Sequence, residues 1–429
     1  MESDCLGAIA DFPNWSPYKV LPQRLVQKPP SPRCEVCVIV PVRNEAQTLE
    51  STLAALANQT DLQSRPLDST RYEIILFANN CSDDSAAIAR RFAEVNPNLA
   101  LHVVEKTLPP SEAYIGRVRQ ILMDEAYRRL IGLGRKRGVI ASTDGDTQVA
   151  PTWIAATLHE IACGADAVGG RIVTESSGRA ALDPYARACH LREVGYRYLV
   201  TELENYFNAD PDDVWPRHYQ HYGASLAVTA EMYEHTGGMP PVRTPEDVAF
   251  YRALVRVNAR FRHSPLVRVT TSARQTGRTN IGLANQLNEW AAMGRRQQPF
   301  LVESGAEIET RLRKRYELRV LWWRILNGYQ PTDNDIAPLA NELGIATRWL
   351  THELAQPHSF GLLFERVEQR QQEEGIWRQR WFPVEIKQAI CQLRVRLDLL
   401  RRQQNCLQHQ PEQSCWEYNR LQRDVVSVP

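Results

Sequence analysis

The feature that most constrains the fold is a short apolar segment at residues 138–147, which ends in two carboxylates, Asp144 and Asp146. A short apolar run that contains Val and Ile predicts a buried strand of an α/β sheet. Ligands of such sheets bind just beyond the carboxyl ends of the strands. Mg²⁺ is usually held by one or two carboxylates together with substrate phosphates. We therefore predict a metal and diphosphate site here, with Asp144 and Asp146 as ligands and with Gly145 letting a phosphate approach the backbone.

An Asp-x-Asp pair is a weak signal by itself, because it arises by chance in a chain of this length. Two other pairs occur, at residues 210–212 and 333–335. Both lie among Pro, Asn and Thr residues, which is typical of turns and helix caps. The context of Asp144 and Asp146, directly after an apolar strand, favours the metal site over a plain turn at the end of a strand.

Composition excludes several classes of protein. The net charge of +1 gives no sign of a nucleic-acid partner. No stretch of apolar residues is long enough to predict a transmembrane span. The N-terminus is acidic and lacks the apolar segment of a secretory signal. Nine scattered cysteines predict free thiols in a reducing compartment, so we expect a cytoplasmic protein.

The pair Cys34-x-x-Cys37 raises the question of a zinc or redox site. The pair lies at the start of a predicted strand, where residues three apart face opposite sides. No second pair of cysteines with this spacing follows. We therefore expect no metal or redox chemistry at Cys34 and Cys37.

From Glu35 onwards, predicted strands alternate with predicted helices, which indicates an α/β fold with a doubly wound, mostly parallel sheet. The first strand lacks a following Gly-x-Gly-x-x-Gly, and the chain has no P-loop sequence, so a usual dinucleotide fold and a P-loop protein are excluded. The predicted strands are residues 36–40, 72–77, 99–105, 167–173 and 266–270, besides the one before Asp144. The predicted helices end near Asn58, span 114–130 and start at Thr152.

The chain divides into three predicted parts. Residues 1–33 are rich in proline and form an N-terminal arm. Residues 34–290 form the predicted α/β domain. From about Asn285 the strand signals vanish, and residues 291–429 form a helical C-terminal region that packs on this domain. A homodimer contact and a contact with a membrane surface are the alternatives for this region.

Four motifs follow one another in a characteristic order: Val38-Ile39-Val40-Pro41-x-x-Asn44-Glu45, then Asn79-Asn80-Cys81-Ser82-Asp83-Asp84, then Arg117-x-Arg119, then Asp144-Gly145-Asp146. Downstream, Tyr222-Gly223-Ala224-Ser225 is followed by Gly237-Gly238-Met239-Pro240 and by Thr244-Pro245-Glu246-Asp247. In this order and spacing, residues 34–290 resemble family-2-type glycosyltransferases.

The resemblance implies an A-type glycosyltransferase fold with a nucleotide-sugar-binding sheet. It implies that the loops after the first two strands hold the base and the ribose of the donor. The residues expected on the nucleotide side are Pro41, Asn44, Glu45, Asn79, Asn80, Arg119 and Asp144. For Arg119, a solvated position on the helix surface is the alternative.

Asn79 and Asn80 stand where the family pattern more often has acidic residues. A carboxylate only accepts hydrogen bonds, whereas an amide both donates and accepts them. Uracil presents groups of both kinds, so UDP is slightly favoured as the nucleotide.

Three more residues near the predicted strand 266–270 are candidates for the site. Arg274 and Arg278 flank a glycine in the following loop, and guanidinium groups bind the oxygens of a diphosphate in a bidentate way. A surface loop is the alternative. His263 comes before the strand and is a candidate third metal ligand, although a structural histidine is the more common case at such a position.

Asp247 follows the Gly-Gly turn at the predicted start of a helix, and we expect it to act as the catalytic base. Glu246 fits equally well as a helix-cap residue. The prediction is a glycosyltransferase that uses Mg²⁺ or Mn²⁺ and a nucleotide-sugar donor, and that inverts the anomeric centre by direct displacement. The acceptor is a hydroxyl of a small molecule, a lipid or a glycan. A nucleotidyl- or glycosyl-phosphate transferase and a catalytically degenerate scaffold are the alternatives.

Overall fold

The computed structural model describes residues 24–274, 282–356 and 358–408. The chain forms two compact units, each of which is built from two segments. The sheet unit contains residues 1–187 and 216–289, and the helical unit contains residues 188–215 and 290–429. A segment from the middle of the chain therefore groups with the C-terminal helices. The predicted division at residue 290 did not anticipate this grouping.

The sheet unit is built on one eight-stranded sheet with the strand order β3-β2-β1-β4-β7-β6-β8-β5. Strands β1, β2, β3 and β4 are paired in parallel, as are β6 and β8, whereas β4–β7, β6–β7 and β5–β8 are antiparallel. The predicted mostly parallel sheet is confirmed. The strands are β1 (Val36–Val42), β2 (Tyr72–Asn79), β3 (Leu101–Lys106), β4 (Val139–Ser142), β5 (Thr147–Val149), β6 (Ala167–Thr174), β7 (Leu226–Thr229) and β8 (Phe261–Thr271).

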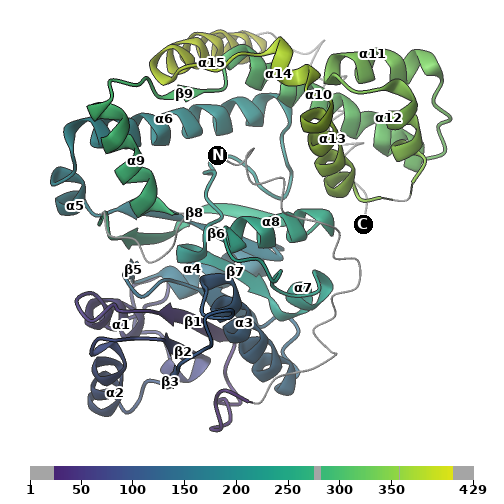
Figure 1. Cartoon of the computed structure of the whole chain (residues 1–429). Helices are drawn as coiled ribbons and strands as arrows, with labels where there is room; N and C mark the ends of the chain where they lie inside the picture. Colours follow the sequence, from purple (N-terminus) through teal and green to yellow (C-terminus); the bar gives the residue numbers. More distant parts are fainter. Residues whose placement is uncertain (1–23, 275–281, 357, 409–429) are drawn as a thin grey trace. The chain divides into compact units, whose positions relative to one another are not determined.

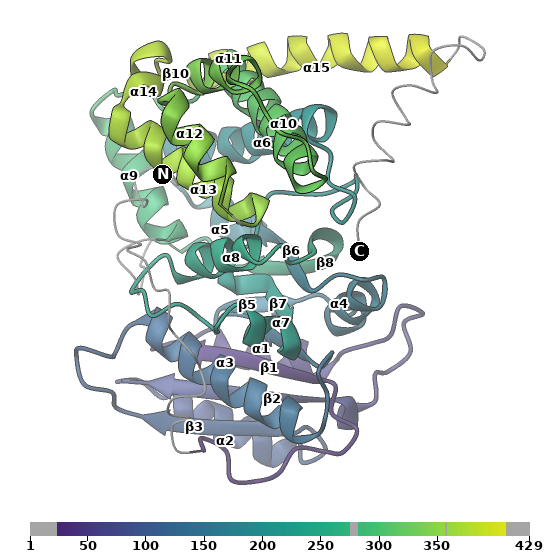
Figure 2. The same ribbon diagram turned by 90° about the vertical axis from the view of Figure 1, so that its right-hand side faces the viewer.

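Helices cover both faces of this sheet, because successive side chains of a strand point to opposite faces. Val38 and Val40 of β1 pack with α1 (Leu49–Ala57), α2 (Ser85–Val95) and α4 (Trp153–Ala162). Cys37 and Ile39 pack on the other face with α3 (Ile115–Gly132), α7 (Ala230–His235) and α8 (Glu246–Arg256). Figures 1 and 2 show α1 and α2 on the side of β1–β3 that is opposite to α3. The predicted doubly wound arrangement is confirmed.

Several strand ends differ from the predicted ones, and three of these differences move a candidate site residue. β1 extends through the buried Pro41, which was expected in the following loop. β2 extends to Asn79, its last residue. β8 begins at Phe261, so that His263 lies within the strand and not before it. These positions carry no local signal, because pairing with a neighbouring strand extends a strand beyond its most apolar core.

Cys34 and Cys37 lie close together, contrary to the expectation that they face opposite sides. Cys34 precedes β1, so strand geometry does not apply to it, and its sulfur, the Cys37 sulfur and a carboxylate oxygen of Glu73 lie within 4.8 Å of one another. Burial raises the pKa of the Cys37 thiol, whose sulfur donates to Glu73 Oε1 at 2.9 Å. Arg129 binds both oxygens of Glu73, at 2.7 and 2.6 Å. A protonated thiol and a neighbouring guanidinium both oppose cation binding at this cluster.

The helical unit contains two apolar cores. One joins α10, α11, α12 and α13, and the other joins residues 196 and 203 of α6 to α10 and α15. Residues 301–302 and 384–385 form the short antiparallel strands β9 and β10, so the expectation that no strand follows residue 285 was wrong. The helices that wholly or partly belong to this unit are α6 (Pro184–Phe207), α9 (Leu283–Arg295), α10 (Gly305–Leu326), α11 (Asp333–Leu343), α12 (Thr347–Leu354), α13 (Phe360–Glu374), α14 (Ile376–Arg380) and α15 (Ile386–Gln408).

Two expectations from the sequence can be compared with this unit. The pair at residues 333–335 is a helix cap, as predicted, since Asp335 Oδ2 accepts from Thr332 N at 2.8 Å at the start of α11. Within the described ranges, none of the helices combines the length and the apolar character that crossing a membrane requires.

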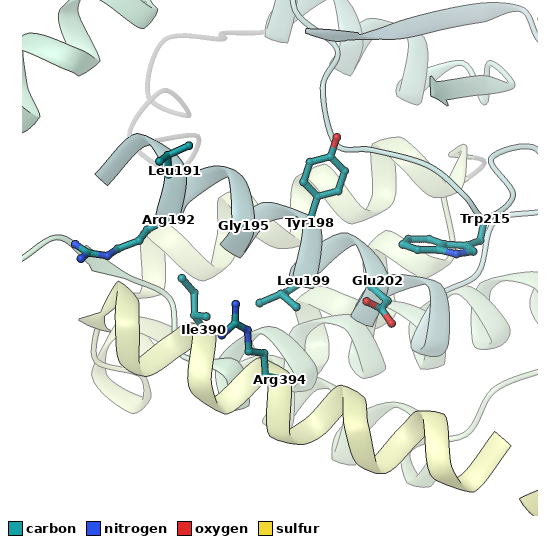
Figure 3. A pocket seen from close by; sticks show the side chains of 9 residues that line it. All are labelled: Leu191, Arg192, Gly195, Tyr198, Leu199, Glu202, Trp215, Ile390 and Arg394. Carbon is teal, nitrogen blue, oxygen red and sulfur yellow. The ribbon is translucent and has the colours of Figure 1, made fainter. Parts of the chain in front are cut away.

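An open groove of about 340 Å³ runs between α6 and α15 in the helical unit. Figure 3 shows Leu199 on α6 with Ile390 and Arg394 reaching toward it from α15. The lining residues are Leu191, Arg192, Gly195, Tyr198, Leu199, Glu202, Trp215, Ile390 and Arg394. Glu202 is neutralised by Arg401, which binds its two oxygens at 2.8 Å. The groove therefore combines an apolar floor with cationic groups.

A buried acid in the core of the sheet unit predicts a pH-dependent stability. Asp124 of α3 accepts from Tyr233 OH at 2.6 Å, and burial raises the pKa of Asp124 to about 6. The folded protein therefore retains a proton that the unfolded chain loses, and the stability from this group is lost as the pH rises through about 6. Asp124→Asn keeps the acceptor without titrating. In urea unfolding, we expect the variant and the wild type to have the same free energy of unfolding near pH 4. At pH 8 we expect the variant to be more stable by up to about 3 kcal/mol.

The matched control is Glu94→Gln, which removes an exposed acid from α2 and should change stability equally little at both pH values. An Asp124→Asn effect of the same size at pH 4 and pH 8 would contradict the assignment.

Candidate active site

The loop that follows β4 carries Asp144, Gly145 and Asp146 next to the end of β1. A Cβ added to Gly145 would lie 3.1 Å from side-chain carbons of both Val42 and Glu45. The carbonyl of Gly145 accepts from Thr52 Oγ1 at 3.1 Å. The glycine thus lets the carboxylate loop pack tightly against the segment after β1. The structure shows this packing reason for Gly145, and the approach of a phosphate stays a prediction.

Arg119 holds the first carboxylate of this loop. It projects from α3 and is 3% exposed, so the alternative of a solvated helix arginine is wrong. Its Nη2 donates to Asp144 Oδ1 at 3.0 Å, and its Nε donates to Glu246 Oε1 at 3.1 Å. Its Nη1 donates to the carbonyl of Gly223 at 3.0 Å and to Ser142 Oγ. Arg119 therefore fixes Asp144 against the start of α8, and its contact with a nucleotide stays a prediction.

Gly223 and Ser142 lie within segments that were singled out from the sequence, but neither was predicted as a site residue. A Cβ on Gly223 would lie 2.4 Å from Arg119 Nη2, so only glycine leaves room for the guanidinium. Ser142 Oγ also donates to the carbonyl of Gly223, at 2.9 Å. The signal available in the sequence was the small residue at each position, which is too common to identify a contact over such chain separations.

The first turn of α8 supplies two more carboxylates, Glu246 and Asp247. Glu246 is 4% exposed, whereas Asp247 keeps part of its surface accessible although protein atoms surround most of it. The two oxygens of Asp247 accept from the backbone N–H of Gly223 and Val248, both at 2.8 Å. Burial is the main cause that raises the pKa of both carboxyl groups, and their mutual repulsion adds to it for Glu246. A fixed carboxylate with a raised pKa suits proton abstraction.

Arg274 holds the second carboxylate of the loop. Its Nη1 and Nη2 bind the two oxygens of Glu45, the second at 2.6 Å. Nη2 also lies 3.1 Å from Asp146 Oδ2. Burial and the neighbouring Asp144 raise the pKa of Asp146 to about 6. Each carboxylate of the Asp-Gly-Asp loop is therefore paired with one arginine, Asp144 with Arg119 and Asp146 with Arg274.

The predicted nucleotide-side residues divide into two kinds. Asn44 and Asn80 have left-handed backbones, with φ of 58° and 50°, and hold loops together. Asn44 Oδ1 accepts from Ser82 N at 2.7 Å, and the Asn80 amide exchanges two hydrogen bonds of 3.0 Å with the Leu108 backbone. Asn79 differs, because its buried Oδ1 accepts no hydrogen bond among the described residues. Asn79 therefore carries a buried acceptor oxygen that no donor among the described residues satisfies.

His263 lies in a cluster of aromatic rings, with ring centroids 4.6 Å from Phe261, 5.8 Å from Tyr251 and 5.9 Å from His221. Asp144, Asp146 and His263 do not form a group of ligating atoms within 4.8 Å of one another in the described part of the chain. His263 as a metal ligand stays a prediction. The candidate Arg278 lies outside the described residues.

Among the described residues, the carboxylates of the site outnumber its guanidinium groups. It brings together five carboxylates (Glu45, Asp144, Asp146, Glu246 and Asp247) and two guanidinium groups (Arg119 and Arg274). The raised pKa of Asp146 reflects this excess as well as burial. Carboxylate oxygens are the ligands that Mg²⁺ prefers, so the residues fit a divalent cation.

Comparison with known proteins finds a family model that matches part of the chain. Residues 37–223 match the model of glycosyl transferase family 2. This range contains Glu45, Arg119 and the Asp-Gly-Asp loop, and it ends before Asp247 and Arg274. Glycosyltransferase AglE of Haloferax volcanii is 28% identical over 153 residues, which are 35% of this chain and 43% of that relative. The chain therefore matches less than half of the length of this relative.

Solved structures with backbone traces that resemble that of this chain include the following two. A mannosyltransferase of Pyrobaculum calidifontis, solved with GDP-Man and Mn²⁺, is 16% identical with a TM-score of 0.37 and 92% of each chain covered. Residues 1–349 of TarS from S. aureus, solved with UDP-GlcNAc, are 12% identical with a TM-score of 0.42; 80% of this chain and 92% of that chain are covered.

Proposed function

Because residues 37–223 belong to glycosyl transferase family 2, we propose that the chain transfers a sugar from a nucleotide-sugar donor to a hydroxyl acceptor with the help of a divalent cation. The observation that carries this proposal is the pair Asp144 and Asp146 at the end of β4, held beside the end of β1 by Arg119 and Arg274. Two parallel strands that end side by side create the crevice in which α/β sheets bind ligands.

The proposed roles follow from the contacts of each side chain. Asp146 and Asp144 would hold Mg²⁺ or Mn²⁺ through their carboxylate oxygens. The bound cation would neutralise negative charge on the diphosphate as it leaves. Arg119 forms ion pairs with both Asp144 and Glu246, and thereby holds the carboxylate loop next to the start of α8.

Asp247 is the proposed base that removes the proton from the acceptor hydroxyl. Its two backbone hydrogen bonds fix its orientation, and it is more accessible than Glu246. A base on the side opposite to the leaving diphosphate supports direct displacement with inversion of the anomeric centre.

The donor nucleotide is proposed to be UDP, and the support for it is Asn79. Its buried oxygen accepts no hydrogen bond from the described residues, and the N3–H group of uracil is a hydrogen-bond donor. CDP is the matched comparison, because cytosine presents an acceptor at N3. We expect UDP to stabilise the protein against heat more than CDP does.

The test of the proposed function is a thermal shift with UDP in Mn²⁺, in Mg²⁺ and in EDTA. A ligand that binds only the folded state raises its apparent stability, so UDP should raise the melting temperature more with metal than in EDTA. Asp146→Asn should remove most of this difference, because it removes a charged ligand of the cation. The production of free UDP from a panel of UDP-sugars, with and without metal, then measures turnover.

The matched control is Asp210→Asn, which changes the exposed Asp-x-Asp pair at residues 210–212. It should leave the metal-dependent shift intact. An equal UDP shift with and without metal would count against the cation site, and binding without any turnover would favour a scaffold protein.

A further inference from the structure

Arg274 lies between two carboxylates that come from different loops. Its guanidinium binds both oxygens of Glu45 and also lies 3.1 Å from Asp146 Oδ2. Glu45 follows β1, Asp146 follows β4 and Arg274 follows β8, so three strand ends meet at this one cation. The guanidinium thus supplies to Asp146 the positive charge that a divalent cation would supply.

We propose that Arg274 is a cation placeholder, which neutralises Asp146 in the free protein and leaves it when a divalent cation binds together with the donor diphosphate. The inference rests on the proposed function, since it requires a metal and a diphosphate at Asp146. It adds a role that the motif does not reveal: Arg274 makes binding of the metal depend on binding of the donor.

Exchange is favoured because the Arg274 guanidinium and a divalent cation on Asp146 would hold like charges close together. Asp146 Oδ2 already faces Arg274, and like charges a few ångströms apart repel each other strongly in a partly buried site. Metal alone therefore either binds against this repulsion or displaces the guanidinium without compensation. A diphosphate brings the missing negative charge, and its oxygens accept the planar guanidinium in the same bidentate way as a carboxylate does.

The side chain that moves is Arg274. Its side chain is 27% exposed, compared with 8% for Glu45 and 14% for Asp146. Glu45 is further held by its backbone N–H, which donates to Ser85 Oγ at 2.8 Å. The two carboxylates are therefore more enclosed than the arginine, which has room to reorient toward a ligand.

Coupling of this kind is reciprocal, so it can be measured from either ligand. We measure the affinity for Mn²⁺ from the electron paramagnetic resonance signal of free Mn²⁺, with and without UDP, for the full chain. In the wild type, UDP should strengthen Mn²⁺ binding by about tenfold or more, which is within the usual range of such coupling. In Arg274→Gln, Mn²⁺ alone should bind about tenfold tighter than in the wild type, and the strengthening by UDP should fall to about twofold or less.

The matched control is Arg268→Gln on β8, the strand that Arg274 follows. Arg268 is exposed, and its Nε donates to the carbonyl of Pro265 at 2.8 Å. This variant should match the wild type in both measurements. A second variant, Arg274→Lys, keeps the charge but loses the bidentate geometry. It should bind Mn²⁺ alone as weakly as the wild type does and show a smaller UDP effect.

Folded Arg274→Gln protein that binds Mn²⁺ alone no tighter than the wild type would overturn the inference. If Arg274→Gln does not fold, Arg274→Lys is the test. If UDP strengthens Mn²⁺ binding in Arg274→Lys as much as in the wild type, the inference is overturned in the same way. In either case, wild-type protein that binds Mn²⁺ and UDP leaves the proposed function standing. Wild-type protein that binds neither ligand at millimolar concentration removes both proposals.

Discussion

Asp247→Asn should lower kcat by about 10²- to 10⁴-fold, which is the usual contribution of a positioned base. The amide preserves the shape of the side chain and can still accept from one of the two backbone N–H groups, of Gly223 or Val248, but it cannot take up a proton at neutral pH. The affinities for UDP and for the metal should change little, because neither oxygen of Asp247 contacts Asp144 or Asp146 in the proposed arrangement. Steady-state kinetics and single-turnover rates separate these effects.

The wild-type pH profile gives a second measurement of the same base. Burial raises the pKa of Asp247, so activity should fall as the pH decreases through this raised value and the carboxylate becomes protonated. Glu231→Gln, at an exposed position of α7, is the control and should keep the wild-type profile. If Glu246→Gln abolished turnover while Asp247→Asn did not, the base would be Glu246.

Arg119→Met should lower the free energy of unfolding by about 3–5 kcal/mol, because it leaves buried carboxylates without their partner. Glu246 is 4% exposed, and Arg119 Nε is the donor to its Oε1. The loss should grow between pH 5 and pH 8. The reason is that the uncompensated Glu246, whose pKa is already raised by burial, must ionise in the folded state as the pH rises. Urea unfolding at both pH values measures this.

The control for this prediction lies one half-turn away on the same helix. Arg117 is 31% exposed and pairs with Glu112 at 3.5 Å, so Arg117→Met should cost about 1 kcal/mol or less. Adding Glu246→Gln to Arg119→Met should recover part of the loss, because it removes an unpaired buried charge. Equal losses for Arg117→Met and Arg119→Met would show that the buried network is not the cause.

The strands and the carboxylate loop could be predicted because their signals are local. Val36–Val42 and Val139–Ser142 are apolar runs, and a parallel sheet buries such strands on both faces. Asp144 and Asp146 follow directly in sequence, so the end of the strand determines where they lie. The order of the motifs then identified the family, which the family model confirms for residues 37–223.

The pairing of these carboxylates could not be predicted, because it joins residues far apart in the chain. Arg274 and Glu45 are separated by 229 positions, and Arg119 and Glu246 by 127. No periodicity of either segment reports such a contact. The short strands β9 and β10 could not be predicted either, because two residues are too few to show the alternation of a strand.

The grouping of residues 188–215 with the C-terminal helices has a consequence during protein synthesis. Tyr196 and Leu203 of α6 pack against Ile308, Leu312 and residues of α15, as far along the chain as Leu397. At about 5–20 residues per second, the ribosome needs roughly 10–40 seconds after making residue 215 to deliver that last partner. During this interval an apolar helix face has been made but its partners have not. The nascent chain is then a substrate for chaperones that bind exposed apolar helices, and a ribosome that stalls before α15 releases a product prone to aggregate.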